Sequence, residues 1–156
     1  MKKLVPKLEV HLTAPHGFVP RVEISACYLE IDNNLLLLQR AQGKLEPGKW
    51  GVPAGKIEKN ESPEKAAIRE LFEETSITVE NFLQLESLDS LYIRKPEIDY
   101  IYHMFRVQLD QIPNVNLSRE EHQHYIWASA KDIKTLPLMD GAIEALHYYQ
   151  GMVPKK

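Results

Sequence analysis

The chain has 156 residues, of which 44% are hydrophobic and 26% charged, a composition typical of soluble globular proteins. This length is enough to bury a real core, and we expect one domain over residues 1–156. The net charge of −3 gives no reason to expect nucleic-acid binding by charge alone, and no apolar run is long enough to cross a membrane. A single cysteine, Cys27, excludes an intrachain disulfide and suits a reducing compartment. We therefore expect a cytoplasmic protein.

The N-terminal part of the chain predicts strands. A short strand is expected over Leu8–Leu12, followed by a loop with two prolines and a glycine. Residues 21–31 then alternate between two faces, which is the period of a strand. Asp32–Asn34 is typical of a turn, and the continuous apolar run Leu35–Leu38 suits a buried strand. The last two strands are expected to form a hairpin.

A helix is predicted to begin at Ser62 and Pro63, a few residues after a glycine turn. The Ser62 side chain can accept a hydrogen bond from an unpaired backbone N–H, and Pro63 has no N–H that needs a partner. At roughly 100° per residue, three glutamates fall within an arc of about 100°, opposite a side that we expect to face the core. The acidic side carries Glu70, Glu73 and Glu74, and the core side carries Ile68, Leu71, Phe72 and Thr75.

The three glutamates favour a divalent-cation site. Carboxylates three and four residues apart repel one another by a few tenths of a kcal/mol per exposed pair. A hard cation reverses this effect, because Mg²⁺ takes oxygen ligands from carboxylates and substrate phosphates together. Arg69 lies four residues before Glu73 and can fix that carboxylate with its planar guanidinium. A solvated acidic helix face is the alternative interpretation.

The spacing around these glutamates follows a longer pattern. Glu61 comes six residues after Gly55, Arg69 comes eight after Glu61, and the segment W-G-V-P-A-G ends at that glycine. The pattern resembles the Nudix box, G-x5-E-x7-R-E-U-x-E-E-x-G-U, where U is an aliphatic residue. Every fixed position fits except one, because Ser76 stands where the family has its last glycine. At motif level the resemblance covers residues 50–77.

The resemblance implies an α/β protein with the Nudix fold, a three-layer α/β/α sandwich with a mixed β-sheet. It also implies Mg²⁺ or Mn²⁺ as the cofactor, because the family binds metal with carboxylates of the box and a backbone carbonyl beside its first glycine. Carried over, the metal ligands are Glu70, Glu73, Glu74 and the carbonyl of Ala54, and the catalytic residues include Glu70 and Arg69. Glu70 is a ligand, the base that activates water, or both.

Beyond the helix, the chain predicts further extended segments. Ile77–Val79 and Leu83–Leu91 are expected to be extended, and Tyr92–Asp99, which contains Pro96, to be a surface loop beside the site. Ile98–Leu109 is rich in aromatic and β-branched residues and predicts a strand across the core.

A second motif, E-H-x-x-Y-x-W, ends at Trp127 and leads into a short strand over Tyr125–Ala128. It resembles several Nudix hydrolases, among them the diadenosine tetraphosphate hydrolases, in which a further carboxylate often comes from the loop before the late strand. By this resemblance Glu121 is the fourth acid, both a metal ligand and a catalytic residue, with Glu120 as the alternative. A charged surface loop is the other interpretation of this segment.

The C-terminal part predicts two helices. A short one is expected over Ala130–Thr135, and Asp140 is expected to cap a last helix over Gly141–Gln150. Gly151 and Pro154 are expected to end that helix. Its apolar residues recur with helical period, at Ile143, Leu146 and Tyr149.

These features together predict a Mg²⁺- or Mn²⁺-dependent hydrolase. Diphosphate hydrolysis requires that several negative charges be neutralised and one proton removed, which an acidic helix with divalent ions achieves. We expect a small-molecule substrate, a nucleoside diphosphate linked to a nucleotide, sugar or similar group, including dinucleoside polyphosphates. Neither nucleic acid nor a membrane is expected as a partner, and a homodimer is left open. Contacts with phosphate or base are left open at Arg21, Lys49, Tyr92 and Arg94.

Two other classes of function stay open. An isopentenyl-diphosphate-isomerase-like enzyme shares the Nudix fold, and Cys27 could serve as its acid or base, although a lone cysteine is more often a small core residue. A catalytically silent Nudix domain could act as a ligand sensor. Such a domain usually lacks some of the box carboxylates, and none is missing here.

Overall fold

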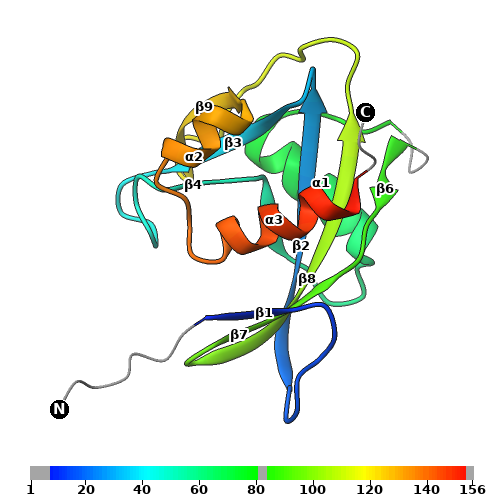
Figure 1. The fold of residues 1–156 in the computed structure, drawn as a ribbon. Coiled ribbons are helices and arrows are strands. Elements are labelled where there is room, and N and C mark those ends of the chain that lie inside the picture. The colour runs from blue at the N-terminus through cyan, green and yellow to red at the C-terminus, as the bar shows by residue number, and fades with distance from the viewer. Residues whose placement is uncertain (1–7, 81–83, 154–156) are drawn as a thin grey trace, which may run out of the picture.

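A computed structural model describes residues 8–80 and 84–153, and its centre is a nine-stranded sheet (Figure 1). Neighbouring strands follow the order β1, β7, β8, β2, β3, β4, while β5 pairs with β2, β6 with β8 and β9 with β3. The strands are β1 (Glu9–His11), β2 (Pro20–Ile31), β3 (Asn34–Arg40), β4 (Trp50–Gly51), β5 (Ala54–Lys56), β6 (Glu86–Ser87), β7 (Leu91–Lys95), β8 (Ile98–Gln108) and β9 (His122–Ala128).

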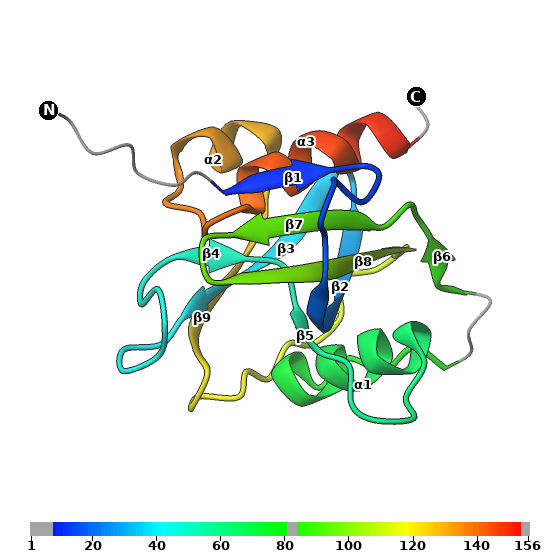
Figure 2. The ribbon, with the colours of Figure 1, turned by 90° about the horizontal axis from the view of Figure 1, so that it is seen from below.

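Helices cover both faces of this sheet. Figure 2 shows α1 on one side and α2 and α3 on the other. Strands β2 and β8 run parallel, whereas the hairpin strands β2 and β3 run antiparallel, so the sheet is mixed. The predicted α/β fold with three α/β/α layers is confirmed. The helices are α1 (Pro63–Thr75), α2 (Ala130–Thr135) and α3 (Ala142–Met152). In the ranges 8–80 and 84–153, no helix is long and apolar enough to cross a membrane.

Alternate side chains of β2 face two separate hydrophobic cores, as the period of the sequence predicted. Leu29 packs in one core with Leu71 of α1. Tyr28 packs in the other, where its ring stacks on that of Tyr149 of α3 with 4.3 Å between the centroids. Each helix layer thus buries its apolar side against the sheet, and burial stabilises by about 25 cal/mol per Å² of apolar surface.

The predicted hairpin is also confirmed. Strands β2 and β3 pair antiparallel, with Glu30 opposite Leu35. Asp32 and Asn33 form the turn with φ angles of 49° and 67°. Asp and Asn adopt this left-handed region more readily than other residues with a side chain, which explains how a turn without glycine can connect the strands.

The predicted surface loop Tyr92–Asp99 is wrong except at Pro96 and Glu97, because its two ends belong to β7 and β8. Leu91–Lys95 forms β7, which pairs antiparallel with both β1 and β8. Leu91 and Ile93 are buried, so alternate side chains of this strand face the core. Pro96 lies in the turn between β7 and β8, where its missing N–H leaves no gap in the ladder of hydrogen bonds.

The extended segments predicted after the box helix form little strand. Only β6 (Glu86–Ser87) pairs within the predicted stretch Leu83–Leu91 before β7 begins, and Leu83 lies outside the described residues. Ile77–Val79 belongs to none of the nine strands. The buried side chains of Ile77 and Val79 nevertheless pack in the core beside α1.

Both ends of α1 follow the sequence. The Ser62 hydroxyl accepts the backbone N–H of Lys65 at 3.2 Å, and Pro63 is the first helical residue. Ser76 ends the helix with φ of 65°, and its N–H donates to the carbonyl of Phe72 at 2.8 Å. Serine therefore keeps the left-handed conformation for which the family pattern has glycine.

Two side chains of α1 do not lie where the helical wheel placed them. Phe72, expected in the core, is 52% exposed, and Glu74, expected on the acidic side, is only 3% exposed. The buried stripe of α1 continues from Ala67 through Leu71 to Glu74, at steps of four and three residues. Phe72 follows Leu71 directly and is therefore rotated by about 100° away from that stripe.

The last helix differs from its prediction at both ends. Gly141, with φ of 84°, is the N-cap of α3, and no side chain caps this end. Asp140 is therefore not the cap. The helix continues through Gly151 to Met152, and Pro154 lies outside the described residues. Of the predicted apolar side, Leu146 and Tyr149 are buried and Ile143 is exposed.

Candidate active site

Strand β5 fixes two glutamates of α1. The N–H of Ala54 donates to Oε2 of Glu74 at 3.1 Å. The carboxylate of Glu70 lies so close to Gly55 that a Cβ at this position would be 2.1 Å from its carboxyl carbon. A Cβ there would displace the Glu70 carboxylate, so glycine at the first position of the box lets this carboxylate keep its place. The carbonyl of Pro63 accepts the hydroxyl of Ser25 at 2.8 Å, which ties the start of α1 to β2.

Arg69 lies at the centre of a group of carboxylates. Its Nε and Nη2 donate to the two carboxylate oxygens of Glu61 at 2.7 and 2.9 Å, a bidentate pair. Its Nη1 donates to Glu70 at 2.8 Å and to Glu73 at 3.1 Å, and its Nη2 also donates to the carbonyl of Lys56 at 3.0 Å. These hydrogen bonds lower the pKa of Glu61 to about 2. The pair with Glu73 exists as predicted, but the shortest hydrogen bond of Arg69 is to Glu61.

Glu74 lies in an environment that does not balance its charge. Burial raises its pKa well above the usual value, and the carboxylates of Glu70 and Glu121 raise it further, while the Ala54 N–H and Arg40 lower it. Burial also raises the pKa of Glu70, against the hydrogen bond from Arg69. A buried carboxylate with two acidic neighbours favours either a proton or a bound cation.

Glu121 reaches this group from the turn before β9. The N–H groups of Glu121 and His122 both donate to the carbonyl of Ser118, at 3.1 and 2.9 Å, and the carbonyl of Glu121 accepts the N–H of Ala41 at 2.9 Å. Glu74, Glu121 and His122 each offer one ligand atom, and these three atoms lie within 4.8 Å of one another. The turn thus places a third chain segment at the buried end of the acidic helix face.

The other predicted residues are placed less centrally. Glu73 is half exposed and bound to Arg69. Ala54 presents its N–H to Glu74. Glu120, the alternative to Glu121, has an exposed side chain. The structure therefore brings together Glu74 and Glu121, with Glu70 close enough to affect the pKa of Glu74.

Two residues of this site were missed by the sequence reasoning. His122 is buried beside Glu74, and burial together with the charge of Arg40 lowers its pKa to about 4. Arg40 ends β3, opposite His122 in the ladder between β3 and β9. Its Nε donates to the carbonyl of Leu45 at 3.2 Å, and its charge affects the pKa of both Glu74 and His122. His122 belongs to the E-H-x-x-Y-x-W motif, so this motif could have identified it as a residue of the site. No motif in the sequence pointed to Arg40.

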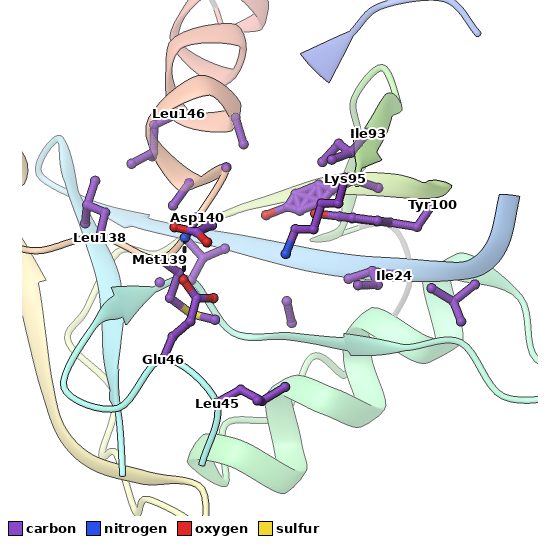
Figure 3. Close-up of a pocket in the computed structure, with 18 of the residues that line it drawn as sticks. Ile24, Leu45, Glu46, Ile93, Lys95, Tyr100, Leu138, Met139, Asp140 and Leu146 are labelled. Atoms are coloured by element: carbon purple, nitrogen blue, oxygen red, sulfur yellow. Dashed lines mark hydrogen bonds between the residues drawn. The ribbon is translucent and has the colours of Figure 1, made fainter. Parts of the chain in front are cut away.

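A mostly apolar cavity of about 390 Å³ lies beside strand β5 (Figure 3). It lies between the sheet and the start of α3, and Ala54 of β5 belongs both to its wall and to the contacts of Glu74. The ammonium of Lys95 lies over the ring of Tyr100, 5.8 Å from the centroid. Apolar side chains that line the cavity include those of Val22, Ile24, Val52, Ile93, Ile98, Leu138 and Leu146.

Acidic groups lie at one side of this cavity. Glu46 accepts the backbone N–H of Asp140 at 2.8 Å, as the dashed line in Figure 3 marks. Lys49, one of the open candidates for a phosphate contact, lies with its Nζ 3.9 Å from Oδ1 of Asp140. The neighbouring Leu45 is largely exposed. The cavity is thus apolar within and charged at its rim.

The remaining candidates for phosphate or base contacts serve other parts of the structure. Arg94 pairs with Asp99 through Nε and Oδ1 at 2.9 Å. The ring of Tyr92 packs edge-on against that of Phe18, with centroids 5.5 Å apart. Both residues therefore stabilise the region around β7. Arg21 is exposed near the start of β2.

The three-layer fold, together with the arginine and glutamates of α1 facing a glycine loop, defines the class of MutT-like Nudix hydrolases. The family model for the NUDIX domain matches residues 19–149. The chain therefore belongs to the NUDIX domain family and is a Nudix pyrophosphohydrolase. The prediction made from the box is confirmed over a region much longer than the box itself.

Comparisons with individual proteins agree with this assignment. The chain is 26% identical to the CTP pyrophosphohydrolase of Escherichia coli over 84% of its own length and 93% of that protein. It is 28% identical to the dihydroneopterin triphosphate diphosphatase of Haemophilus influenzae, covering 78% and 82% of the two chains. The crystal structure of a MutT NUDIX hydrolase from Burkholderia pseudomallei matches with a TM-score of 0.69 at 22% identity, over 81% and 95% of the chains. This last similarity shows the fold.

Proposed function

We propose that this protein hydrolyses a diphosphate linkage in a nucleoside diphosphate derivative or a related compound, with Mg²⁺ or Mn²⁺ as cofactor. The observation that carries the proposal is the junction at β5. On one side, buried Glu74 lies with Glu70 and Glu121, and on the other side the apolar cavity begins at Ala54. A phosphate chain at the carboxylates would therefore place the attached organic group in the cavity.

The residues present fit a hard divalent cation. Glu74 is buried with two acidic neighbours that raise its pKa, and a cation would remove that repulsion. Carboxylate oxygens suit both Mg²⁺ and Mn²⁺. We assign Glu74, Glu121 and Glu70 to the ion. Glu73 and the carbonyl of Ala54 complete the proposed set.

Bound there, Mg²⁺ or Mn²⁺ supplies positive charge against the diphosphate and lowers the pKa of water. In the reaction, the oxygen of a water molecule bonds to phosphorus, the bond to the leaving phosphate oxygen breaks, and a carboxylate takes the proton. Glu70 suits this last role because burial raises its pKa, so it accepts a proton more readily than an ordinary glutamate. Glu121 is the other candidate. Arg69 holds Glu70 by a 2.8 Å hydrogen bond, which makes it a positioning residue.

The lining of the cavity favours a substrate whose organic group contains an aromatic ring. Its walls are aliphatic and aromatic, and its rim carries both amines and carboxylates that can contact the polar edge of a base. Two relatives are named as a CTP pyrophosphohydrolase and a dihydroneopterin triphosphate diphosphatase. Their names support a substrate in which a triphosphate is attached to a group that contains a heterocycle. We propose substrates of this kind first, with sugar nucleotides and dinucleoside polyphosphates as further members of the same class.

A substrate panel tests this function. The protein is incubated with Mg²⁺ or Mn²⁺ and with nucleoside triphosphates, dihydroneopterin triphosphate, sugar nucleotides, dinucleoside polyphosphates and an isoprenoid diphosphate. Phosphate is measured directly and after added pyrophosphatase. Metal-dependent release from at least one nucleoside or pterin compound is expected. Turnover of the isoprenoid diphosphate alone, or of no compound, would contradict the proposal.

The two other classes receive less support. Burial raises the pKa of the Cys27 thiol to about 12, with Glu74 adding to the effect, so this cysteine is a poor acid or base for an isomerase. A silent ligand-binding domain would not need grouped carboxylates that repel one another. In this chain the charges of Glu70 and Glu121 raise the pKa of Glu74, and the charge of Glu121 also raises the pKa of Glu70.

A further inference from the structure

His122 is a buried imidazole beside the carboxylate cluster, and residues 8–80 and 84–153 provide no hydrogen-bond partner for its Nδ1. The residue is only 4% exposed. Its Nε2 lies 3.8 Å from Oε1 of Glu74, which is too far for a hydrogen bond. Buried polar side chains in folded proteins nearly always have a partner. An unpartnered ring beside a cluster of carboxylates therefore points to a ligand that both would share.

The distances suit a shared cation. Ligand bonds to nitrogen and oxygen are about 2.0–2.2 Å long, so two ligands of one ion lie about 3 Å apart when adjacent and about 4 Å apart when opposite. The separation of 3.8 Å between Nε2 of His122 and Oε1 of Glu74 falls in this range. Glu121 offers a third atom, all three within 4.8 Å of one another. Small side-chain movements would bring them onto one ion.

The backbone explains how two consecutive residues can face the same site. In a regular strand, neighbouring side chains point to opposite faces, so Glu121 and His122 would diverge. Here the pairing of β3 with β9 shifts register between Gln39 and Arg40, and Arg40 pairs with His122. The turn that closes on the carbonyl of Ser118 precedes this shift. Such irregularities re-aim side chains next to active sites.

We propose that a ring nitrogen of His122 is a ligand of the divalent cation, which makes the site a mixed oxygen and nitrogen site that prefers Mn²⁺ to Mg²⁺. This inference rests on the proposed function, in which a cation binds at Glu74 and Glu121. Imidazole is a softer ligand than carboxylate and favours transition-metal ions, whereas Mg²⁺ gains little from exchanging an oxygen for a nitrogen. The carboxylates would hold either ion, and the histidine would set the preference.

The test detects nitrogen at the ion directly. Mn²⁺ is bound to the intact wild-type protein, and electron spin-echo modulation is recorded for unlabelled protein and for protein labelled with ¹⁵N in histidine only. We expect modulation from ¹⁴N that changes to the ¹⁵N pattern with the label. Bound Mn²⁺ without histidine modulation would overturn the inference, and this measurement needs no variant that must fold.

His122→Gln locates the signal, with His124→Gln as the matched control at an exposed position of the same strand. Glutamine keeps an oxygen of similar reach. We expect His122→Gln to lose the modulation and to weaken Mn²⁺ binding about 10- to 100-fold, with less than about a 3-fold change for Mg²⁺ in competition. His124→Gln should match the wild type. Equal losses for both ions, or modulation that survives in His122→Gln, would overturn the inference.

Two outcomes separate this inference from the proposed function. If Mn²⁺ binds, is lost in Glu74→Gln and shows no histidine modulation, the carboxylate site stands and the role of His122 is refuted. If Mn²⁺ binding is unchanged in Glu74→Gln, the cation does not bind at the carboxylates, and the proposed function fails together with the inference.

Discussion

Two groups of carboxylates meet at helix α1, and they differ in which charges and donors surround them. Around Arg69, the carboxylates of Glu61 and Glu73 accept hydrogen bonds from the guanidinium. Around Glu74, the neighbours are Glu70 and Glu121, and the backbone N–H of Ala54 is a donor to its carboxylate. The carboxylates of the first group share one cation, and the second group is a buried cluster of like charges.

This difference indicates what each group does. In the first group the guanidinium donates a hydrogen bond to each carboxylate, so Arg69 can hold the glycine loop against the helix without any added ion. The Glu74 group has repulsion that the protein alone does not remove, which is the condition under which a cation contributes most. Glu70 belongs to both groups, because it accepts a hydrogen bond from Arg69 and its charge raises the pKa of Glu74.

The largest effect is expected for Glu74→Gln. The change removes a ligand charge with almost no change in volume, so turnover should fall by about 100-fold or more at saturating Mg²⁺ while the fold is kept. Turnover is measured by phosphate release, and the fold by circular dichroism. Glu80→Gln, at an exposed glutamate shortly after the same helix, is the control and should behave as wild type. Near-wild-type turnover of Glu74→Gln would refute the assignment.

Glu121→Gln tests the other end of the same cluster. As a ligand or base, Glu121 acts on the chemical step, so kcat should fall about 10- to 100-fold with little change in KM. Glu120→Gln, at the exposed neighbouring position, should have a mild effect. Steady-state kinetics on the best substrate of the panel measures both. The reverse ranking would move the role to Glu120, and equally small effects would return both residues to the surface.

The two groups should also respond to pH with opposite sign in metal-free protein. Arg69 lowers the pKa of Glu61 from 4.5 to about 2, so its contribution to stability is present above the unfolded pKa and is lost as pH falls toward 2. The pKa of Glu74 is raised above 4.5, so the folded protein binds a proton on this carboxylate more tightly than the unfolded chain does. The free energy of unfolding therefore declines as pH rises above 4.5.

Denaturant unfolding between pH 3 and pH 8 with a chelator measures both effects. Glu61→Gln should flatten the acid side of the stability profile, and Glu74→Gln should remove the decline toward neutral pH. Added Mg²⁺ should likewise offset that decline in the wild type, because the ion takes the place of the proton. An unchanged profile in Glu74→Gln would show that its carboxylate is not the unbalanced charge.

The smallest effect is expected beyond the acidic face, at Ser76→Gly. The φ of 65° at Ser76 costs a residue with a Cβ roughly 1 kcal/mol, and glycine relieves this while adding entropy to the unfolded chain. Stability should therefore stay equal or rise by up to about 1 kcal/mol, with activity unchanged. The denaturant midpoint measures this. A clearly lowered midpoint would mean that the 3.4 Å hydrogen bond from the Ser76 hydroxyl to Asn116 outweighs the strain.

The sequence by itself determined the elements whose signals are local. The cap at Ser62, the proline after it and the spacing of the glutamates predicted α1, and the alternation of residues 21–31 between two faces predicted a strand. The box also predicted which carboxylates to consider. The predictions of α1 and of this strand are confirmed because caps, helical period and strand period depend on residues only a few positions apart.

Only the tertiary structure decided which charges meet. Whether Glu74 or Phe72 is buried depends on how α1 is rotated against the sheet, and β7 is a strand because β1 and β8 lie on both sides of it. Arg40 and His122 approach Glu74 through pairing of strands that are distant in sequence. No local period encodes such contacts, because the free energy that fixes them comes from packing between segments.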